Sequence, residues 1–453
     1  MENRHLIVIS VDALVYEDIA DTSQLPLFAR LIREGELIKN VRTIFPSLTH
    51  PVHASIITGQ PAGVTGITAN TVFTPGEEEM PWYNKLPEIQ CETIFDLTHR
   101  AGLKTAACHW PVTANAGEKI DYNIPELTSE DLAGVIKEPM QTCSDIEKQH
   151  IQADQDAVKA YINTGMSPCL TEILETALKK YGSSLEHPVY DEVQIECACE
   201  IIRRFKPDVL FTHPGTVDSE RHRTGLFSPE VVAAVKKSEE WIGSVIQAAK
   251  DAGIYENTDF IILSDHGHLP YSKIVRLNAL FAAEGLIRLN DDGSIKDWDA
   301  YAQSCDLSAY IYLKRPEDAD IRRCVEKLIT TGPIHGREEQ TTFGTILDNE
   351  EAEKLYGLKG DFSYVIEAAE GYCFSDEWRG EAIYEEKYQE AGKDIDSLSG
   401  ISDRPSHSAH GHRPEKGPQP VFIGFGPDFE KGKVTDGGNI LDFFRIFRDL
   451  LKI

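Results

Sequence analysis

Several short apolar runs of the chain are each followed or preceded by Asp or His. The runs lie at 5–11, 208–212, 259–264 and 421–426, and the polar residues beside them are Asp12, Asp218, His222, Asp265, His266 and His410. Carboxylate and imidazole groups are ligands that zinc and other first-row metals accept. A single Asp after a strand is more often a turn or helix-capping residue. Taken together, the repeated placement of Asp and His indicates a metal site.

A hydroxyl residue, Thr49, lies in the segment 45–53 (FPSLTHPVH), just before the apolar run 54–59. Thr followed closely by Pro51 predicts that a helix begins near Thr49. One role for this threonine is helix capping. The other is that of a nucleophile, because metal coordination activates a hydroxyl and a helix N-terminus favours an anion. The residues alone leave both roles open.

Strands that alternate with helices would position these side chains. Apolar, β-branched runs separated by helical periods indicate an α/β fold with a mostly parallel sheet between helices. Ligands of such sheets bind beyond the carboxyl ends of the strands, so we expect the Asp and His residues to meet at one edge. We expect strands at 5–11, 105–108, 208–212, 259–264 and 421–426, and helices at 25–34, 93–101, 189–205, 229–252 and 440–451.

Two stretches interrupt this alternation. Residues 113–188 are mostly helical and polar, which predicts an excursion from the sheet. Residues 271–400 mix strand and helix patterns. We therefore expect a catalytic core formed by residues 1–270 and 401–453, with a smaller α+β cap, residues 271–400, inserted over the active-site edge.

The charge balance argues against some partners. Lys and Arg number 45 against 74 Asp and Glu, a formal net charge of −29. This excess of negative charge disfavours the binding of a nucleic-acid polymer. It also means that a phosphorylated substrate must be held by cations close to it. Nine cysteines without a CxxC pair, an apolar start too short for a signal peptide, and no membrane-length apolar run predict a cytoplasmic protein without a membrane partner. The oligomeric state stays open.

The chemical residues belong to a wider pattern of sequence blocks at both ends of the chain. The blocks are 8–13, 45–70, 109–111, 218–222, 263–267 and 409–426. In order and spacing they resemble the nucleotide pyrophosphatase/phosphodiesterase (type I phosphodiesterase) family of the alkaline phosphatase superfamily. The threonine within FPSLTHPVH, followed by ITG, favours this branch. The resemblance implies an alkaline-phosphatase-like sheet sandwiched by helices.

The resemblance also implies a hydrolase with two divalent metal ions. One site would use Asp12, Thr49, Asp265 and His266, and the other would use Asp218, His222 and His410. Thr49 would be the nucleophile that forms a covalent phospho-threonine, and Asn70 would donate to a phosphoryl oxygen. Two cations roughly 4 Å apart clamp the attacking and leaving oxygens of such a displacement. Zinc is expected, and Asp/His sites accept Mn or Fe as well.

The chain departs from the family pattern at His50, where the family has an aromatic residue that stacks on a nucleotide base. We therefore expect weak base recognition and a small phosphorylated or phosphonate substrate. The expected function is that of a phosphodiesterase or pyrophosphatase. Alternatives are a phosphonate hydrolase of the phosphonoacetate type, a phosphomonoesterase and, from another class, a catalytically silent binding protein.

Other histidines lie near these blocks. His53 is expected either to orient a carboxylate or to be an ordinary core residue. His268, His407 and His412 are expected to be bystanders.

Overall fold

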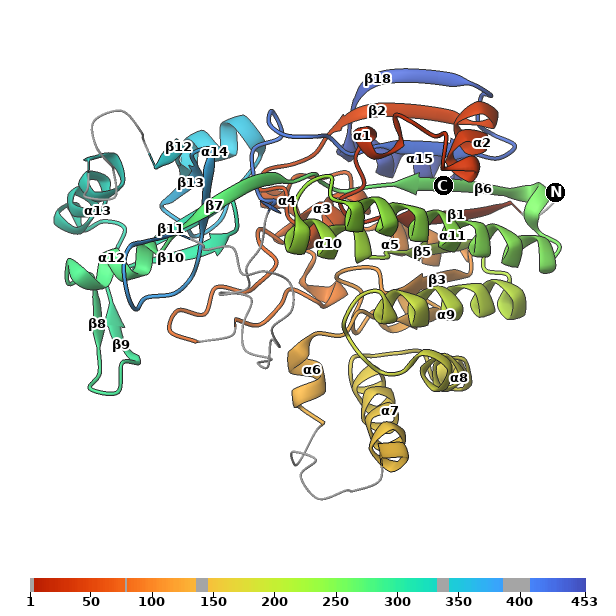
Figure 1. The fold of residues 1–453 in the computed structure, drawn as a ribbon, viewed down its shortest axis with the longest axis horizontal. Coiled ribbons are helices and arrows are strands. Elements are labelled where there is room, and N and C mark those ends of the chain that lie inside the picture. Colours follow the sequence, from red (N-terminus) through yellow and green to blue (C-terminus); the bar gives the residue numbers. More distant parts are fainter. Residues whose placement is uncertain (1–3, 78–79, 136–145, 332–341, 386–407) are drawn as a thin grey trace.

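A large sheet forms the centre of the molecule, which we describe from a computed structural model for residues 4–77, 80–135, 146–331, 342–385 and 408–453 (Figure 1). The sheet has eight strands in the order β18-β2-β17-β6-β1-β5-β3-β4. Their bounds are β1 His5–Ser10, β2 Glu36–Arg42, β3 Thr105–Cys108, β4 Tyr122–Ile124, β5 Val209–Thr212, β6 Thr258–Leu263, β17 Phe422–Phe425 and β18 Lys433–Asn439.

Most neighbours in this sheet are parallel. β1 pairs in parallel with β5 and β6, and β3 pairs in parallel with β5 and β4. This arrangement confirms the expected mostly parallel α/β sheet. β17 runs antiparallel to both β6 and β2. The apolar pattern indicates neither β2 nor the edge strand β18 that pairs with it.

Helices cover both faces of the sheet, and alternate side chains of β1 point into two different cores. Ile7 and Ile9 pack in one core, and Leu6 and Val8 pack in the other. The first core includes α2 (Pro26–Glu34), α9 (Val189–Phe205) and α11 (Pro229–Asp251). The second includes α3 (Thr49–Ile56), α5 (Ile94–Ala101) and α15 (Phe443–Leu451). Burial on both faces explains why the inner strands are continuous apolar runs.

The described residues between 113 and 188 form helices and also supply a strand to the large sheet. Its helices are α6 (Ser129–Ala133), α7 (Ile146–Asn163) and α8 (Thr171–Tyr181). β4 pairs with β3 at the edge of the sheet, so the excursion is not wholly outside it.

Smaller sheets form a cap beyond one end of the large sheet (Figure 1). One sheet has the order β10-β11-β13-β12, and another groups β7 with β14, β15 and β16. The bounds are β7 Leu269–Val275, α12 Leu277–Ala283, β8 Ile287–Leu289, β9 Ile295–Trp298, β10 Ala300–Cys305, β11 Ser308–Leu313, α13 Ala319–Thr331, β12 Phe343–Asp348, α14 Asn349–Tyr356, β13 Tyr364–Ala368, β14 Gly371–Phe374, β15 Ile383–Glu385 and β16 Ser408–Ala409. Whether core and cap are separate domains with the expected boundaries stays a prediction.

The cap meets the core where the β10–β11 hairpin lies against the segment after β16. The backbone N–H of Leu307 donates to the carbonyl of His410 at 2.9 Å, and that of Gly411 donates to the carbonyl of Ser47 at 3.0 Å. Gly411 has a φ of +82°, and a Cβ at this position would lie 2.0 Å from the carbonyl oxygen of Cys305. Only glycine lets the hairpin approach this closely.

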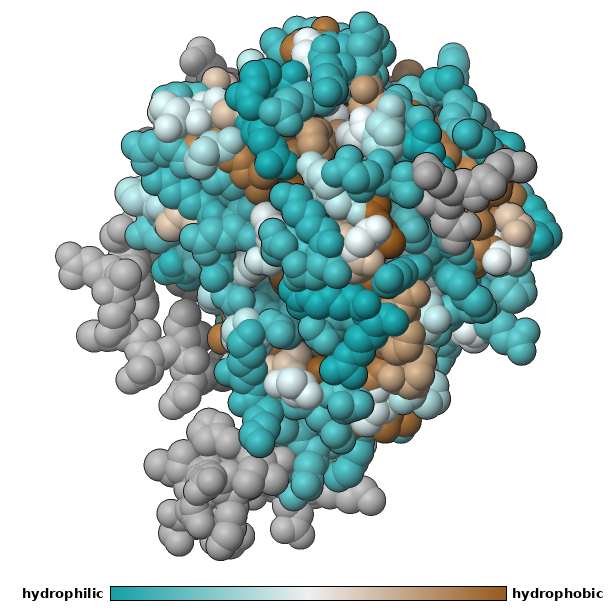
Figure 2. All heavy atoms as spheres, turned by 90° about the vertical axis from the view of Figure 1, so that its right-hand side faces the viewer, coloured by the Kyte–Doolittle hydropathy of each residue, from teal (hydrophilic) through white to brown (hydrophobic). Residues whose placement is uncertain are grey.

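The face of the molecule remote from the cap is mostly hydrophilic, with small hydrophobic patches (Figure 2). Among the helices of the described residues, none has both the length and the hydropathy needed to cross a bilayer.

We predict that Gly411→Ala destabilises the protein more than a matched substitution. Gly102→Ala is the control, because Gly102 also has a positive φ, +73°, but has open space around it. The control should lose about 1–2 kcal/mol of unfolding free energy from the left-handed backbone alone. Gly411→Ala should lose at least about 2 kcal/mol more, since a side chain there clashes with backbone. Denaturant unfolding measures the difference, and equal losses would refute the close approach.

Candidate active site

The carboxyl ends of β1, β5 and β6 face one edge of the large sheet and carry the predicted residues to it. Asp12 follows β1, and Asp265 and His266 follow β6. The helix after β5, α10 (Thr216–Thr224), holds two further predicted residues on one face, one turn apart. The structure brings together all the predicted metal-site residues, namely Asp12, Thr49, Asp218, His222, Asp265, His266 and His410.

The first group of donors surrounds His266. Its Nε2 lies 3.2 Å from Asp265 Oδ2, 3.5 Å from Asp12 Oδ1 and 3.2 Å from Thr49 Oγ1. Bonds of about 2.0–2.2 Å to a tetrahedral zinc ion place neighbouring donors roughly 3.3–3.6 Å apart, close to these separations. Asp12 Oδ1 and Asp265 Oδ2 are buried and have no hydrogen-bond partner among the described residues. Both oxygens are therefore available to a cation.

The second group surrounds Asp218. Its Oδ2 lies 3.6 Å from His222 Nε2, and its Oδ1 lies 3.9 Å from His410 Nε2. His410 Nδ1 lies 3.0 Å from the carbonyl oxygen of Ser47. Because a carbonyl only accepts, Nδ1 carries the proton and donates. Nε2 of His410 therefore faces a carboxylate at a distance longer than a hydrogen bond, an arrangement that a cation between the two would stabilise.

Among the described residues, the carboxylates at this edge have no Lys or Arg ion-pair partner. In the part of the chain that the structure describes, every ion-pair partner of Asp12, Asp218 and Asp265 is a histidine. Burial raises the pKa of Asp265 to about 7, and burial together with the charge of Asp265 raises the pKa of Asp12 well above its usual range. Burial would also raise the pKa of Asp218, but the neighbouring histidines hold it well below its usual range. Divalent cations would favour the ionised form of all three carboxylates, so the residues fit a metal centre.

One of the expected bystanders, His268, contacts the site. It is buried, and its Nε2 lies 2.7 Å from Asp218 Oδ1, while its Nδ1 lies 3.1 Å from Ser408 Oγ. A separation of 2.7 Å is a hydrogen bond and is too short for two ligands of one ion, so His268 orients Asp218. His412 is buried and its Nε2 contacts the carbonyl of Lys416 instead, whereas His407 lies outside the described residues.

His53 is a buried residue next to the first donor group. It is fully buried, with Nδ1 2.8 Å from the carbonyl of Thr49 and 3.6 Å from Asp265 Oδ2. Its Nε2 lies 2.9 Å from Ser10 Oγ. His53 therefore ties the first turn of α3 to β1 and lies beside one of the carboxylates.

Beside Thr49 lies a small group of polar and aromatic residues. Asn70 Oδ1 accepts a hydrogen bond from the backbone N–H of His50 at 3.0 Å, which leaves its amide group as the side that could donate to a ligand. The His50 ring lies 5.0 Å from the Trp82 ring, and its Nε2 lies 3.6 Å from Glu126 Oε2. Burial lowers the pKa of His50 to about 4 and raises that of Glu126 to about 7.

Three residues near the two donor groups were not predicted from the sequence. Asp306 Oδ2, in the cap, lies 3.6 Å from His410 Nε2. Trp82 and Glu126 reach the site from loops remote from the sequence blocks. The contact of His268 with the site could have been expected, because His268 lies in the loop that also holds Asp265 and His266.

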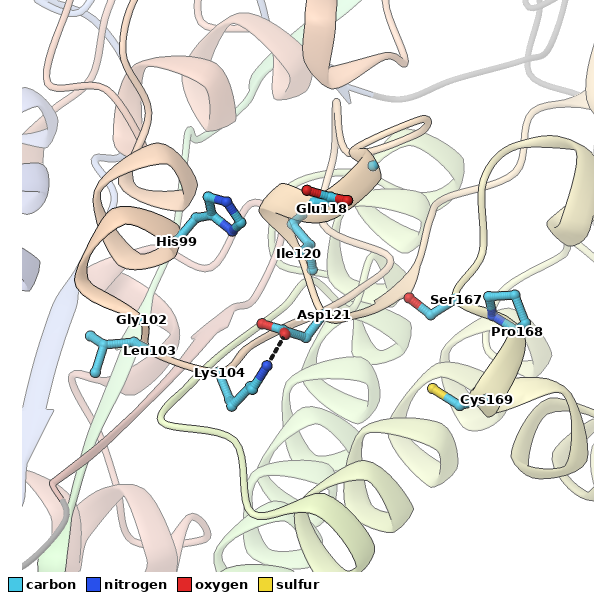
Figure 3. A pocket seen from close by; sticks show the side chains of 11 residues that line it. His99, Gly102, Leu103, Lys104, Glu118, Ile120, Asp121, Ser167, Pro168 and Cys169 are labelled. Carbon is cyan, nitrogen blue, oxygen red and sulfur yellow. Dashed lines mark hydrogen bonds and ion pairs between the residues drawn. The ribbon is translucent and has the colours of Figure 1, made fainter.

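A separate pocket of about 540 Å³ lies at the other end of the strands (Figure 3). Lys104 and Asp121, which form an ion pair at 2.6 Å, line it just before β3 and β4 begin. Ligands of open α/β sheets bind at the carboxyl ends, and none of the predicted ligands lines this pocket. It is therefore not part of the candidate active site.

Known proteins share this fold. Murine ectonucleotide pyrophosphatase/phosphodiesterase 5 superimposes with a TM-score of 0.61 at 18% identity, covering 99% of this chain and 95% of that chain. The human protein of the same name gives the same values. The likeness confirms the expected alkaline-phosphatase-like fold class.

Curated relatives match over part of their length. The chain is 24% identical over 254 residues to mouse ectonucleotide pyrophosphatase/phosphodiesterase family member 1, covering 54% of this chain and 21% of the relative. It is 23% identical over 274 residues to human bis(5'-adenosyl)-triphosphatase, covering 58% of this chain and 47% of the relative. The chain thus spans between about a fifth and about half of the length of these relatives.

The sequence also matches a protein family as a whole. The family described as type I phosphodiesterase / nucleotide pyrophosphatase matches residues 6–394, which include the first six of the seven predicted metal-site residues in chain order. The match covers most of the chain. The chain therefore belongs to the type I phosphodiesterase / nucleotide pyrophosphatase family, as its sequence blocks predicted.

Proposed function

We propose that the chain is a two-metal hydrolase that cleaves phosphodiester or pyrophosphate bonds with Thr49 as the nucleophile. The observation that carries this proposal is the position of the Thr49 hydroxyl, 3.2 Å from His266 Nε2 at the first residue of α3. Membership of the family supports it. So do the names of the relatives, which specify a pyrophosphatase/phosphodiesterase and a triphosphatase.

The two donor groups would each hold one divalent cation. The first would use Asp12, Thr49, Asp265 and His266, and the second would use Asp218, His222 and His410. Bound there, such ions neutralise charge on the attacking and leaving oxygens and activate a coordinated hydroxyl or water. We propose zinc, and Mn or Fe would also suit Asp and His ligands.

The residues of the chain position the reacting atoms. Thr49 Oγ1 forms a bond to phosphorus while the bond from phosphorus to the leaving oxygen breaks, which gives a phospho- or nucleotidyl-threonine. Water then attacks phosphorus and releases Thr49. Asn70 would donate its amide N–H to a phosphoryl oxygen, and the start of α3 offers backbone N–H groups to the same charge.

The substrate would be a small phosphorylated molecule whose base contributes little to binding. His50 is 3% exposed and enclosed by Trp82 and Glu126, so it offers little open ring surface for stacking. A nucleotide is one candidate substrate, and the complex of an inactive variant of murine ectonucleotide pyrophosphatase/phosphodiesterase 5 with AMP supports it. If the base were stacked after all, the half-buried Trp82 is the aromatic residue beside His50 that would supply the stacking.

Neither rival activity has a specific observation in its favour. A phosphonoacetate hydrolase would need a Lys or Arg directed at the substrate carboxylate.

For the location we propose the cytoplasm. All eight cysteines in the described part of the chain are free thiols, as in a reducing compartment.

We predict that Thr49→Ala lowers kcat by about 10³-fold or more, because the attacking oxygen is lost. Thr49→Ser keeps a hydroxyl and is the matched control, which should retain turnover. Steady-state kinetics on an aryl phosphodiester, with circular dichroism to check folding, gives the comparison. If the alanine variant kept more than about a tenth of the wild-type kcat, Thr49 would not be the nucleophile.

We predict that His222→Ala lowers the bound metal from about two ions per chain to about one. The reason is that His222 is expected to supply a ligand to only one of the two sites. Elemental analysis after gel filtration measures the stoichiometry. His99→Ala, which removes an exposed histidine of α5, should leave the metal content unchanged. Undiminished metal in His222→Ala would exclude this histidine from the site.

We predict weak discrimination of the base. Stacking on an aromatic contributes roughly 1–3 kcal/mol per base, and 1.4 kcal/mol is tenfold in rate. The ratio of kcat/KM for a nucleoside aryl ester to that for a methyl aryl ester should therefore stay below about a hundred. A larger ratio that disappears in Trp82→Ala would show that Trp82 supplies the stacking that His50 lacks.

A further inference from the structure

The cap places a carboxylate, Asp306, beside the second donor group. Its Oδ2 lies 3.6 Å from His410 Nε2, and ligand atoms of Asp306, His222 and His410 all lie within 4.8 Å of one another. In the part of the chain that the structure describes, its ion-pair partner is His410 and no Lys or Arg is paired with it. We propose that Asp306 is a fourth ligand of the cation held by Asp218, His222 and His410, an inference that rests on the proposed two-metal function.

The contacts of His410 favour a cation over a simple hydrogen bond. Its Nδ1 donates to the carbonyl of Ser47, which leaves Nε2 for a further contact. Nε2 faces carboxylate oxygens of Asp306 at 3.6 Å and Asp218 at 3.9 Å, separations that are too long for a hydrogen bond. A divalent cation between these groups would take both imidazole and carboxylate as ligands.

The distances distinguish Asp306 from His268. A ligand pair on a tetrahedral ion with bonds of about 2.0–2.2 Å is roughly 3.3–3.6 Å apart. The separation of 3.6 Å between Asp306 and His410 equals that between the predicted ligands Asp218 and His222. His268, at 2.7 Å from Asp218, is hydrogen-bonded instead. Relative to His410, Asp306 thus has the spacing of a ligand.

The β10–β11 hairpin holds Asp306 in this position. Asp306 begins its two-residue loop with a φ of +58°, a conformation that Asp, Asn and Gly accept most readily. The carbonyl of Asp306 accepts from the backbone N–H of Phe374 at 2.7 Å, and the next residue, Leu307, donates to the carbonyl of His410. The backbone at Asp306 is therefore held by the cap on one side and by the His410 segment on the other.

A ligand from the cap has a consequence for the site. Three protein donors leave a fourth position of a zinc ion open to water or substrate. Asp306 would fill that position in the resting enzyme, so a substrate must displace it or raise the coordination number to five. The metal would also link the cap to the core.

Zinc titration of the stripped full-length protein tests the inference. The variants are Asp306→Asn and Asp306→Gly, which both tolerate the positive φ, with Asp361→Asn as a control for loss of one exposed cap carboxylate. Competition with a chromophoric chelator gives the dissociation constant of each site. Both Asp306 variants should weaken one site at least tenfold and leave the other unchanged, and Asp361→Asn should match wild type. Less than a tenfold effect in both Asp306 variants would overturn the inference.

His222→Ala separates this inference from the proposed function. If His222→Ala weakens one site and the Asp306 variants do not, the inference falls and the two-metal proposal stands. If none of these variants weakens zinc binding, both fall. As a second readout, zinc should slow hydrogen exchange of the β10–β11 hairpin in wild type and not in Asp306→Gly, since the ion then no longer links cap and core.

Discussion

The ends of three neighbouring strands bring three carboxylates together, two of them buried, and none is paired with a lysine or arginine in the described part of the chain. Asp12 and Asp265 face each other across His266, and both have raised pKa values because burial disfavours their ionised forms. Folding alone therefore leaves this edge electrostatically unfavourable. Divalent cations are the simplest groups that would balance it, and the spacing of the donors agrees with tetrahedral coordination. The net charge of −29 repels a phosphate substrate as well, so such a substrate also needs cations at close range.

The fold brings the donor residues together from distant parts of the chain. The order of strands places β1 between β5 and β6, so residues 12, 218 and 265 become neighbours despite their separation in sequence. His410 arrives from the segment after the cap, and glycine at position 411 lets the β10–β11 hairpin lie directly against it. The position of the cap is therefore linked to the geometry of the site.

The sequence could predict the inner strands because burial on both faces makes them continuous apolar runs. It could not indicate β18, whose residues are mostly exposed and include Asp436 and two glycines. The sequence pattern also could not predict that β17 is antiparallel, because the direction of this strand depends on the path that the chain takes through the cap. The metal-site residues were found because they lie beside strands or in family blocks. Asp306 was missed because a single Asp in an inserted hairpin has no such context, and the role of His268 depends on a contact with Asp218 fifty residues away.

Anomalous diffraction from crystals grown with zinc tests the central claim most directly. We predict two peaks, one bordered by Asp12, Thr49, Asp265 and His266, and the other bordered by Asp218, His222 and His410. Data collected on both sides of the zinc absorption edge would identify the metal. A single peak, or peaks only outside these residues, would contradict the account.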